Sequence, residues 1–177
     1  MVEKISVLIS EEEVNERIKE LGRQISEDYA GRQVHLVCIL KGASFFMCEL
    51  AKRITVPVSI DFMSVSSYGS STVSSGIVRV VKDLEKSVKG RDVLIVEDIV
   101  DSGRTICYLE ELFRERECAS VRAVTLLDKP DRRVMSTKVD YTGFVIPDQF
   151  VVGYGMDYDE RYRNLPFIGL VELGENS

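Results

Sequence analysis

The sequence predicts an α/β protein with a mostly parallel, twisted sheet and helices on both of its faces. Apolar runs of strand length alternate with segments whose apolar residues recur at helical spacing. Gly-containing turns and a capping-box pattern mark the boundaries between them. The chain has 177 residues and is 45% hydrophobic, which suffices for one core, so we expect a single domain over residues 1–177. Ligands of such a sheet bind beyond the carboxyl ends of its strands.

The first elements along the chain are a helix, a strand and a second helix. Ser10 and Glu13 have the spacing of a capping box, and the apolar residues that follow have the spacing of an amphipathic helix: Val14, Ile18, Leu21 and Ile25. Val34 to Leu40 is an apolar run of strand length that ends at Lys41 and Gly42. Helical periodicity then resumes.

Four further strands are expected, at Val56 to Val65, Ile77 to Val81, Val93 to Val96 and Val121 to Leu127. A segment rich in Ser and Gly, at about residues 66–76, predicts a mobile loop. Helical spacing begins near Thr105. The tail is strand-like around Phe144, Phe150 and Phe167, and we expect the terminal segments to form a small hood over the sheet.

The composition argues against several classes of function. The net charge of -6 disfavours a general grip on nucleic acid. The first residues lack the pattern of a secretory signal, and no apolar stretch approaches the ~20 residues of a membrane span, so we expect no membrane partner and a cytoplasmic location. The four cysteines show no CxxC spacing and are interpreted as reduced core thiols. His35 is interpreted as structural.

The run VLIVEDIVDSGRTI predicts a site for a phosphorylated sugar. Glu97 and Asp98 follow the point where the buried strand should end. In the next turn, Gly103 lets the backbone approach a ligand closely, while Ser102 and Thr105 offer hydroxyl groups. The backbone N–H groups at the start of the following helix suit an anion.

Taken alone, that turn fits an ordinary capped helix start equally well. The two preceding carboxylates favour the sugar site, because acids at the end of a buried strand are hard to solvate unless they bind hydroxyl groups or a cation such as Mg²⁺. The chain contains neither GxxxxGK[ST] nor GxGxxG, which argues against a nucleotide triphosphatase and a dinucleotide enzyme.

This run resembles the phosphoribosyl pyrophosphate signature of the type I phosphoribosyltransferases. Over nearly its full length the chain resembles the hypoxanthine-guanine branch of that family, through LKG at 40–42, SY at 67–68, LLDKP at 126–130 and IPDQFVVGYGMDYDERYRNLP at 146–166. The resemblance implies the type I phosphoribosyltransferase fold. It also implies transfer of a 5-phosphoribosyl group from phosphoribosyl pyrophosphate to N9 of a 6-oxopurine, giving IMP or GMP and pyrophosphate. Mg²⁺ would be required, with two ions during turnover.

The resemblance assigns the sugar half of the site. Glu97 and Asp98 match the acids around the ribose hydroxyls and a metal ion. The 5′-phosphate cradle is matched by Asp101, Ser102, Gly103, Arg104 and Thr105. Asp101 also matches the acid near purine N7 that takes a proton as N9 attacks the anomeric carbon.

The resemblance also assigns the pyrophosphate. Lys41 and Gly42 match the pyrophosphate loop, in which members of the family often have a cis peptide after the residue matching Leu40. Arg163 matches a cation for the same group, and Asp157 matches the ligand of the second Mg²⁺. Without the resemblance, Asp157 and Arg163 would be interpreted as part of a solvated charge run.

The purine half rests on three residues. Lys129 matches the lysine that donates to O6 of the purine, which favours an oxo group over the amino group of adenine. Phe150 matches the aromatic residue that stacks on the base, and Val151 matches main-chain contacts to its edge. Ser67 and Tyr68 match a lid over the site. Otherwise Lys129 would be a solvated turn residue and Phe150 a core residue.

The resemblance further implies a homodimer or homotetramer that acts on small molecules and not on nucleic acid. Departures from the family are small: Ala43 follows LKG where Gly or Ser is common, and Arg104 stands where Lys is frequent. Two other functions remain as alternatives. One is a regulatory RNA-binding protein on the same fold, and the other is a phosphoribosyltransferase for adenine, uracil or orotate.

Overall fold

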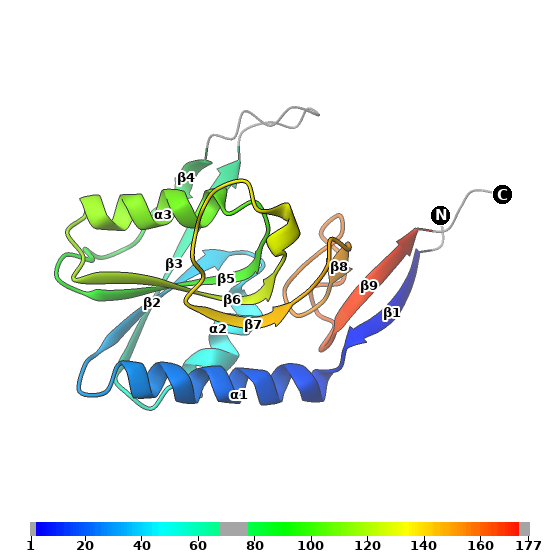
Figure 1. The fold of residues 1–177 in the computed structure, drawn as a ribbon, viewed down its shortest axis with the longest axis horizontal. Coiled ribbons are helices and arrows are strands. Elements are labelled where there is room, and N and C mark those ends of the chain that lie inside the picture. Colours follow the sequence, from blue (N-terminus) through cyan, green and yellow to red (C-terminus); the bar gives the residue numbers. More distant parts are fainter. Residues whose placement is uncertain (1–2, 68–77, 174–177) are drawn as a thin grey trace.

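The computed structural model describes residues 3–67 and 78–173 (Figure 1). Its main sheet has the strand order β4-β3-β2-β5-β6-β7. These strands are β2 (Val34–Leu40), β3 (Val58–Ser67), β4 (Val78–Lys82), β5 (Asp92–Val100), β6 (Ser120–Asp128) and β7 (Tyr141–Val145). All neighbouring pairs are parallel except β3 with β4 at one edge. The predicted mostly parallel α/β sheet is confirmed.

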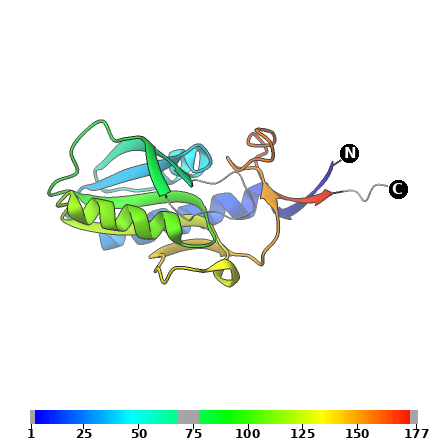
Figure 2. The same ribbon diagram turned by 90° about the horizontal axis from the view of Figure 1, so that it is seen from above.

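Helices cover both faces of this sheet (Figures 1 and 2). The helices α1 (Glu11–Asp28) and α2 (Ser44–Ala51) pack on one face, and α3 (Arg104–Glu115) packs on the other. Each face has its own apolar cluster. The side chains of β2 are buried along almost its whole length, as a central parallel strand requires.

The chain changes direction across the sheet between β2 and β5. From β2 it passes through α2 to β3 on one side, and from β5 it passes through α3 to β6 on the other. Such a point opens a crevice at the carboxyl ends of the two strands. The pairing of β2 with β5 stops at Cys38 and Val96, whereas β5 continues along β6 as far as Val100 and Asp128.

This pairing corrects one prediction. The strand was expected to end at Val96, with Glu97 and Asp98 beyond it, but both acids lie inside β5. They remain strand residues because β6 still supplies a hydrogen-bonded neighbour after β2 has diverged. At these two acids, β5 is therefore paired with β6 on one side and has no pairing with β2 on the other.

A second, three-stranded antiparallel sheet has the order β1-β9-β8. It joins β1 (Glu3–Ile9), β9 (Ile168–Leu173) and β8 (Val151–Val152), and it stands beside the main sheet in Figure 1. The predicted hood from the terminal segments is confirmed. Phe144 lies in β7 of the main sheet, whereas Phe150 and Phe167 directly precede the two hood strands instead of lying in them.

The loop predicted at about residues 66–76 overlaps the end of β3 at Ser66 and Ser67, and its remaining residues, Tyr68 included, lie outside the described part of the chain. All four cysteines are free thiols, but only Cys38 is buried and Cys48 is exposed, so the expectation of four core thiols was wrong. Cys48 faces outward because it lies on the solvent side of α2.

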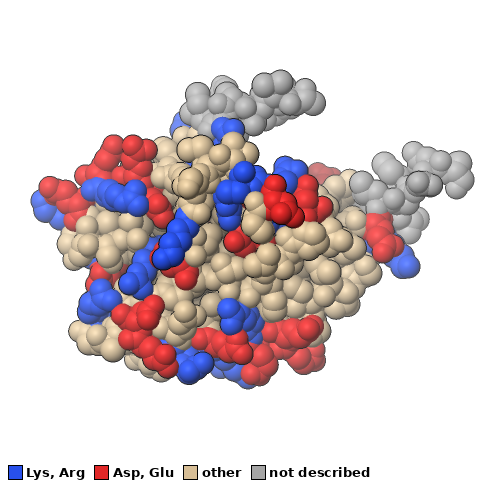
Figure 3. All heavy atoms as spheres, in the orientation of Figure 1, with Lys and Arg blue, Asp and Glu red and all other residues tan. Residues whose placement is uncertain are grey.

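Charges of both signs are interspersed on the face shown in Figure 3. That view shows no broad basic surface of the kind that nucleic-acid binding needs. Among the helices that the structure describes, none is long and apolar enough to cross a membrane.

The capping box of α1 yields a stability prediction. The Ser10 hydroxyl accepts from the Glu13 N–H at 3.3 Å, and the Glu13 carboxylate accepts from the Ser10 N–H at 2.9 Å. Ser10→Ala removes the first of these bonds and should cost about 1 kcal/mol, or about 2–4 °C in Tm. Ser10→Thr keeps a capping hydroxyl and should melt close to the parent. Equal melting temperatures for all three proteins in a thermal scan would contradict the assignment.

Candidate active site

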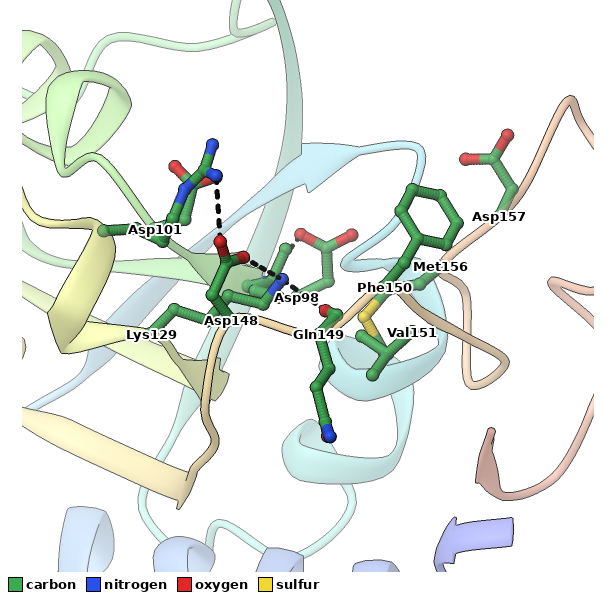
Figure 4. Close-up of a pocket in the computed structure, with 11 residues that line it drawn as sticks. Asp98, Asp101, Lys129, Asp148, Gln149, Phe150, Val151, Met156 and Asp157 are labelled. Atoms are coloured by element: carbon green, nitrogen blue, oxygen red, sulfur yellow. Dashed lines mark hydrogen bonds and ion pairs between the residues drawn. The ribbon is translucent and has the colours of Figure 1, made fainter. Parts of the chain in front are cut away.

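A cavity of about 570 Å³ opens at the carboxyl ends of β5 and β6, against the hood (Figure 4). Its lining comprises Asp98, Ile99, Asp101, Lys129, Arg132, Asp148, Gln149, Phe150, Val151, Met156 and Asp157. Residues far apart in the sequence thus meet where the topology predicts a ligand. In Figure 4, Asp101 and Asp157 stand on opposite sides of this cavity.

The two acids of β5 have different surroundings. Glu97 is 6% exposed, and burial, with the neighbouring Asp98, raises its pKa well above the usual range. Burial also raises the pKa of Asp98 to about 6, although the N–H of Ile99 bonds to its Oδ1 at 2.8 Å and Arg163 opposes the rise. Asp98 lines the cavity, whereas Glu97 is absent from the described lining. A nearby cation would favour the charged form of both carboxyls.

The turn after β5 presents the start of α3. Gly103 is the N-cap residue, with a φ of 79° and no side-chain cap bond to the helix. Its side-chain position is crowded, because a methyl group there would lie 2.8 Å from Cγ2 of Thr137. Gly therefore meets two requirements, a left-handed backbone and space. Because the N-cap residue has no side chain to bond to the helix and the first turn contains no acid, the N–H groups at the start of α3 suit an anion.

Side chains hold the same turn in place. Oδ1 of Asp101 accepts a short hydrogen bond from the N–H of Ser102, and the Ser102 hydroxyl accepts from the N–H of Arg104 at 3.4 Å. Nη1 of Arg133 donates to the Asp101 carbonyl at 2.9 Å, while its Nη2 is paired with Asp128.

Sequence reasoning missed Arg133 and Asp128. Both side chains are largely buried, at 19% and 14% exposure, so the pair is a fixed part of the turn's support. The only signal was their position, with Asp128 inside LLDKP and Arg133 three residues after it, in a run of charges that is otherwise typical of a solvated turn.

Another wall of the cavity combines a buried cation with an exposed ring. Lys129 is 9% exposed, and its Nζ donates to the Gln149 carbonyl at 2.6 Å and lies 3.6 Å from Asp148 Oδ1 (Figure 4). Phe150 is 53% exposed beside the cavity and meets Tyr158 edge to face, with ring centroids 5.5 Å apart. Val151 is 7% exposed and begins β8. Sequence reasoning missed Asp148, the carboxylate that faces Lys129.

The loop after β2 packs directly against Asp98. The Leu40–Lys41 peptide is cis, as the resemblance suggested. A methyl group on Gly42 would overlap Oδ2 of Asp98 and lie 2.6 Å from its Cγ, and one on Gly155 would overlap the Gly42 carbonyl oxygen. Close backbone approach therefore brings this loop, β5 and the loop between β8 and β9 together.

Arg163 holds together the loop between β8 and β9. Its Nη1 donates to the Gly155 carbonyl at 2.7 Å, and its Nη2 lies 2.8 Å from Asp157 Oδ1. Nε of Arg163 is buried and has no hydrogen-bond partner within residues 3–67 and 78–173. Among the described residues, Asp157 is the one that both lines the cavity and pairs with this cation.

The structure thus unites most of the predicted residues. Asp98, Asp101, Lys129, Phe150, Val151 and Asp157 share one cavity, and the cradle adjoins it through Asp101. Lys41, Gly42 and Arg163 adjoin it through Asp98 and Asp157. Glu97 is buried next to Asp98 in β5 and does not belong to the described lining of the cavity. Ser67 ends a strand whose continuation is outside the described part of the chain.

The carboxylates that line the cavity can be compared with the ligands that Mg²⁺ requires. Within residues 3–67 and 78–173, no group of three or more His, Cys, Asp or Glu side chains could hold a metal. Mg²⁺, however, commonly binds through one or two carboxylates, with water and substrate phosphate as the other ligands. Asp98 and Asp157 face the same cavity, and the charge of Asp157 contributes to the raised pKa of Asp98. These residues fit Mg²⁺ on that basis.

Comparison with known proteins gives a consistent picture. Residues 10–159 match the model of the phosphoribosyl transferase domain. The hypoxanthine-guanine phosphoribosyltransferase of Bacillus subtilis is 55% identical over 166 residues, which cover 94% of this chain and 92% of that protein. A hypoxanthine phosphoribosyltransferase structure from Staphylococcus aureus is 50% identical, with a TM-score of 0.91, and the match covers 94% of this chain and 91% of the other.

The bifunctional protein TilS/HprT of Listeria innocua is 58% identical over 166 residues, but the match spans 94% of this chain and only 26% of that protein. The relatives of similar length are therefore the informative ones. A domain match over most of the chain, together with 55% identity to a relative of nearly equal length, shows that the chain belongs to the hypoxanthine-guanine phosphoribosyltransferase family.

Proposed function

We propose that this protein transfers the 5-phosphoribosyl group of phosphoribosyl pyrophosphate to N9 of hypoxanthine or guanine, giving IMP or GMP and pyrophosphate. The observation that carries the proposal is the shared cavity, which joins the acid of a phosphate turn, Asp101, to a buried lysine and an exposed ring, Lys129 and Phe150. The first two features suit a sugar phosphate and an oxo group, and the third suits a flat base.

The sugar half would bind as follows. The uncapped start of α3 and the hydroxyls of Ser102 and Thr105 hold the 5′-phosphate. Asp98 faces the ribose hydroxyls from β5, and the buried Glu97 supports that wall. Lys41, Gly42 and Arg163 face the pyrophosphate. When bound at Asp98 and Asp157, Mg²⁺ supplies positive charge that neutralises the leaving pyrophosphate.

The purine half would bind against the opposite wall. Two contacts of the Lys129 ammonium are to Gln149 and Asp148, and an ammonium has three N–H donors, so one can reach O6 of the base. The exposed face of Phe150 stacks on the ring, and the main chain at Val151 contacts its edge. Asp101 takes the N7 proton as N9 attacks the anomeric carbon.

The proposal also includes two Mg²⁺ ions during turnover, a cytoplasmic location, a homodimer or homotetramer, and a lid that includes Ser67 and Tyr68. Each of these stays a prediction. Closure of such a lid would exclude water, which competes with the purine for the ribose carbon.

The direct test is a panel of bases. Initial rates with phosphoribosyl pyrophosphate and Mg²⁺ should be measurable with hypoxanthine and guanine, and far lower with adenine and uracil. Xanthine belongs in the same panel, because the motifs do not rank it. Absence of IMP and GMP formation by the purified protein would overturn the proposal.

Lys129→Gln tests the purine wall. A neutral amide loses a charged hydrogen bond to O6, worth about 1.5–3 kcal/mol, so kcat/KM for hypoxanthine should fall roughly 10- to 100-fold. The amide can also accept from the amino group of adenine, so discrimination against adenine should weaken. KM for phosphoribosyl pyrophosphate should change little. Lys138→Gln is the control, because that side chain is 85% exposed. Equal losses for all bases would contradict the role of Lys129.

A further inference from the structure

The two cations that would hold the pyrophosphate, Lys41 and Arg163, already face one carboxylate of the chain. Nζ of Lys41 lies 3.0 Å from Oε2 of Glu160, and Nη2 of Arg163 lies 3.4 Å from Oε1 of the same side chain. Each oxygen of the carboxylate therefore meets one cation. The chain itself places an anion where the leaving group of the substrate would bind.

The backbone around Glu160 holds this arrangement at a conformational cost. Tyr158 and Arg161 exchange two backbone hydrogen bonds, of 3.1 and 3.0 Å, across a two-residue hairpin turn. The central residues, Asp159 and Glu160, have positive φ angles of 52° and 59°. Such turns favour Asn, Asp and Gly, and Glu is unusual there. Residues in such a conformation persist where the contacts around them hold the backbone in place, and they cluster at functional sites.

A third contact fixes the turn over the site. The N–H of Glu160 donates to Oδ2 of Asp157 at 2.8 Å, so the acid that faces the cavity also anchors the turn. Oδ1 of Asp157 shares Arg163 with Glu160. The Glu160 side chain remains 65% exposed and can move into solvent without opening the core.

We propose that Glu160 is an internal competitor of pyrophosphate, which occupies Lys41 and Arg163 until the substrate displaces it. The inference rests on the proposed function, because it takes the pyrophosphate site from it. A carboxylate brings one negative charge, whereas pyrophosphate brings several, so the substrate displaces Glu160 and a weaker anion does so less readily. Each exposed ion pair contributes little free energy, so displacing Glu160 from the two cations costs little.

The expected benefit lies in product release. A tethered carboxylate has a high effective concentration at the two cations, so it rebinds as soon as pyrophosphate loosens. Glu160 would weaken ground-state binding of pyrophosphate and speed its departure. The residue would thus set the affinity of the site without contacting the reacting atoms.

Glu160→Gln is the test, with the Kd of pyrophosphate measured by calorimetry in the presence of Mg²⁺ at low salt. Removing the competitor should lower Kd roughly two- to fivefold, as expected for exposed ion pairs. The gain should shrink at high salt, because screening weakens the pairs that Glu160 makes. The rate of pyrophosphate release should fall in parallel.

Asp159→Asn is the matched control. It removes the same charge from the adjacent turn position, and within the described part of the chain Asp159 has no ion pair with Lys41 or Arg163. Its Kd should stay near that of the parent. Equal tightening in both variants would assign the effect to net charge and overturn the inference. An unchanged Kd in Glu160→Gln would also overturn it, because Glu160 would then not compete with pyrophosphate. A higher Kd would overturn it by showing that Glu160 positions the two cations.

These outcomes are separable from failure of the proposed function. If the parent forms IMP and GMP but Glu160→Gln leaves the Kd of pyrophosphate unchanged, the inference fails and the function stands. If the variant binds pyrophosphate more tightly but no base gives a nucleotide, the function fails and the competition at Lys41 and Arg163 stands.

Discussion

Asp101→Asn should slow phosphoribosyl transfer by roughly 10²- to 10⁴-fold, the usual contribution of a positioned general base. The Asn side chain has nearly the same shape, and its carbonyl oxygen can still accept from the N–H of Ser102, so the turn should persist. What is lost is the carboxylate that, in the proposed function, takes the N7 proton. KM for phosphoribosyl pyrophosphate should therefore change far less than kcat.

Single-turnover rates with hypoxanthine are the appropriate measurement, because slow product release can hide the chemical step in kcat. Asp131→Asn is the control, since Asp131 is an exposed acid in the short helix Pro130–Arg132 that follows Lys129. An unchanged single-turnover rate in Asp101→Asn would remove this residue from the chemistry.

Gly42→Ala should reduce kcat/KM by more than about 100-fold, because misplacement of about 1 Å in a site can cost that much. The added methyl group would overlap the Asp98 carboxylate, so either the acid or the Lys41–Gly42 loop must move. In the proposed function, Asp98 faces the ribose and the loop faces the pyrophosphate. Overpacking of this kind also costs about 1–3 kcal/mol in stability.

Gly31→Ala separates the two effects. Gly31 has a φ of 75° and open space around it, so Ala there strains the backbone without touching the site. This variant should lose stability and keep its activity. Thermal scans and initial rates on both variants make the comparison, and near-parental kcat/KM in Gly42→Ala would show that the close contact with Asp98 is dispensable.

Local sequence patterns predicted the parts of the fold that depend on local physics. The strand Val34–Leu40 and the capped helix from Glu11 follow from apolar spacing and one hydrogen-bonded box. The turn at Gly103 was recognised from residue types that suit a helix start. The resemblance to the family then supplied Lys129 and Phe150, which no local pattern distinguishes from surface or core residues.

The rest depends on contacts between distant segments. Glu97 and Asp98 proved to be strand residues because β6, and not the sequence around them, continues the pairing. Arg133 could not be identified because its role requires knowing that its loop lies against Asp101. The positive φ of Glu160 has no signature in its residue type. The lid at Tyr68 and the number of domains stay predictions.

The pairing of β1 with β9 has a consequence for how the protein is made. Glu3 pairs with Leu173, so during synthesis on the ribosome β1 cannot form its sheet until β9 has been made. The phosphate turn and β5 emerge much earlier and pack with segments that precede or closely follow them. β8, which begins at Val151, also pairs with β9. The nascent chain can therefore assemble β5 and the turn at Gly103 first, and it completes the cavity wall that includes Val151 only after β9 has left the exit tunnel.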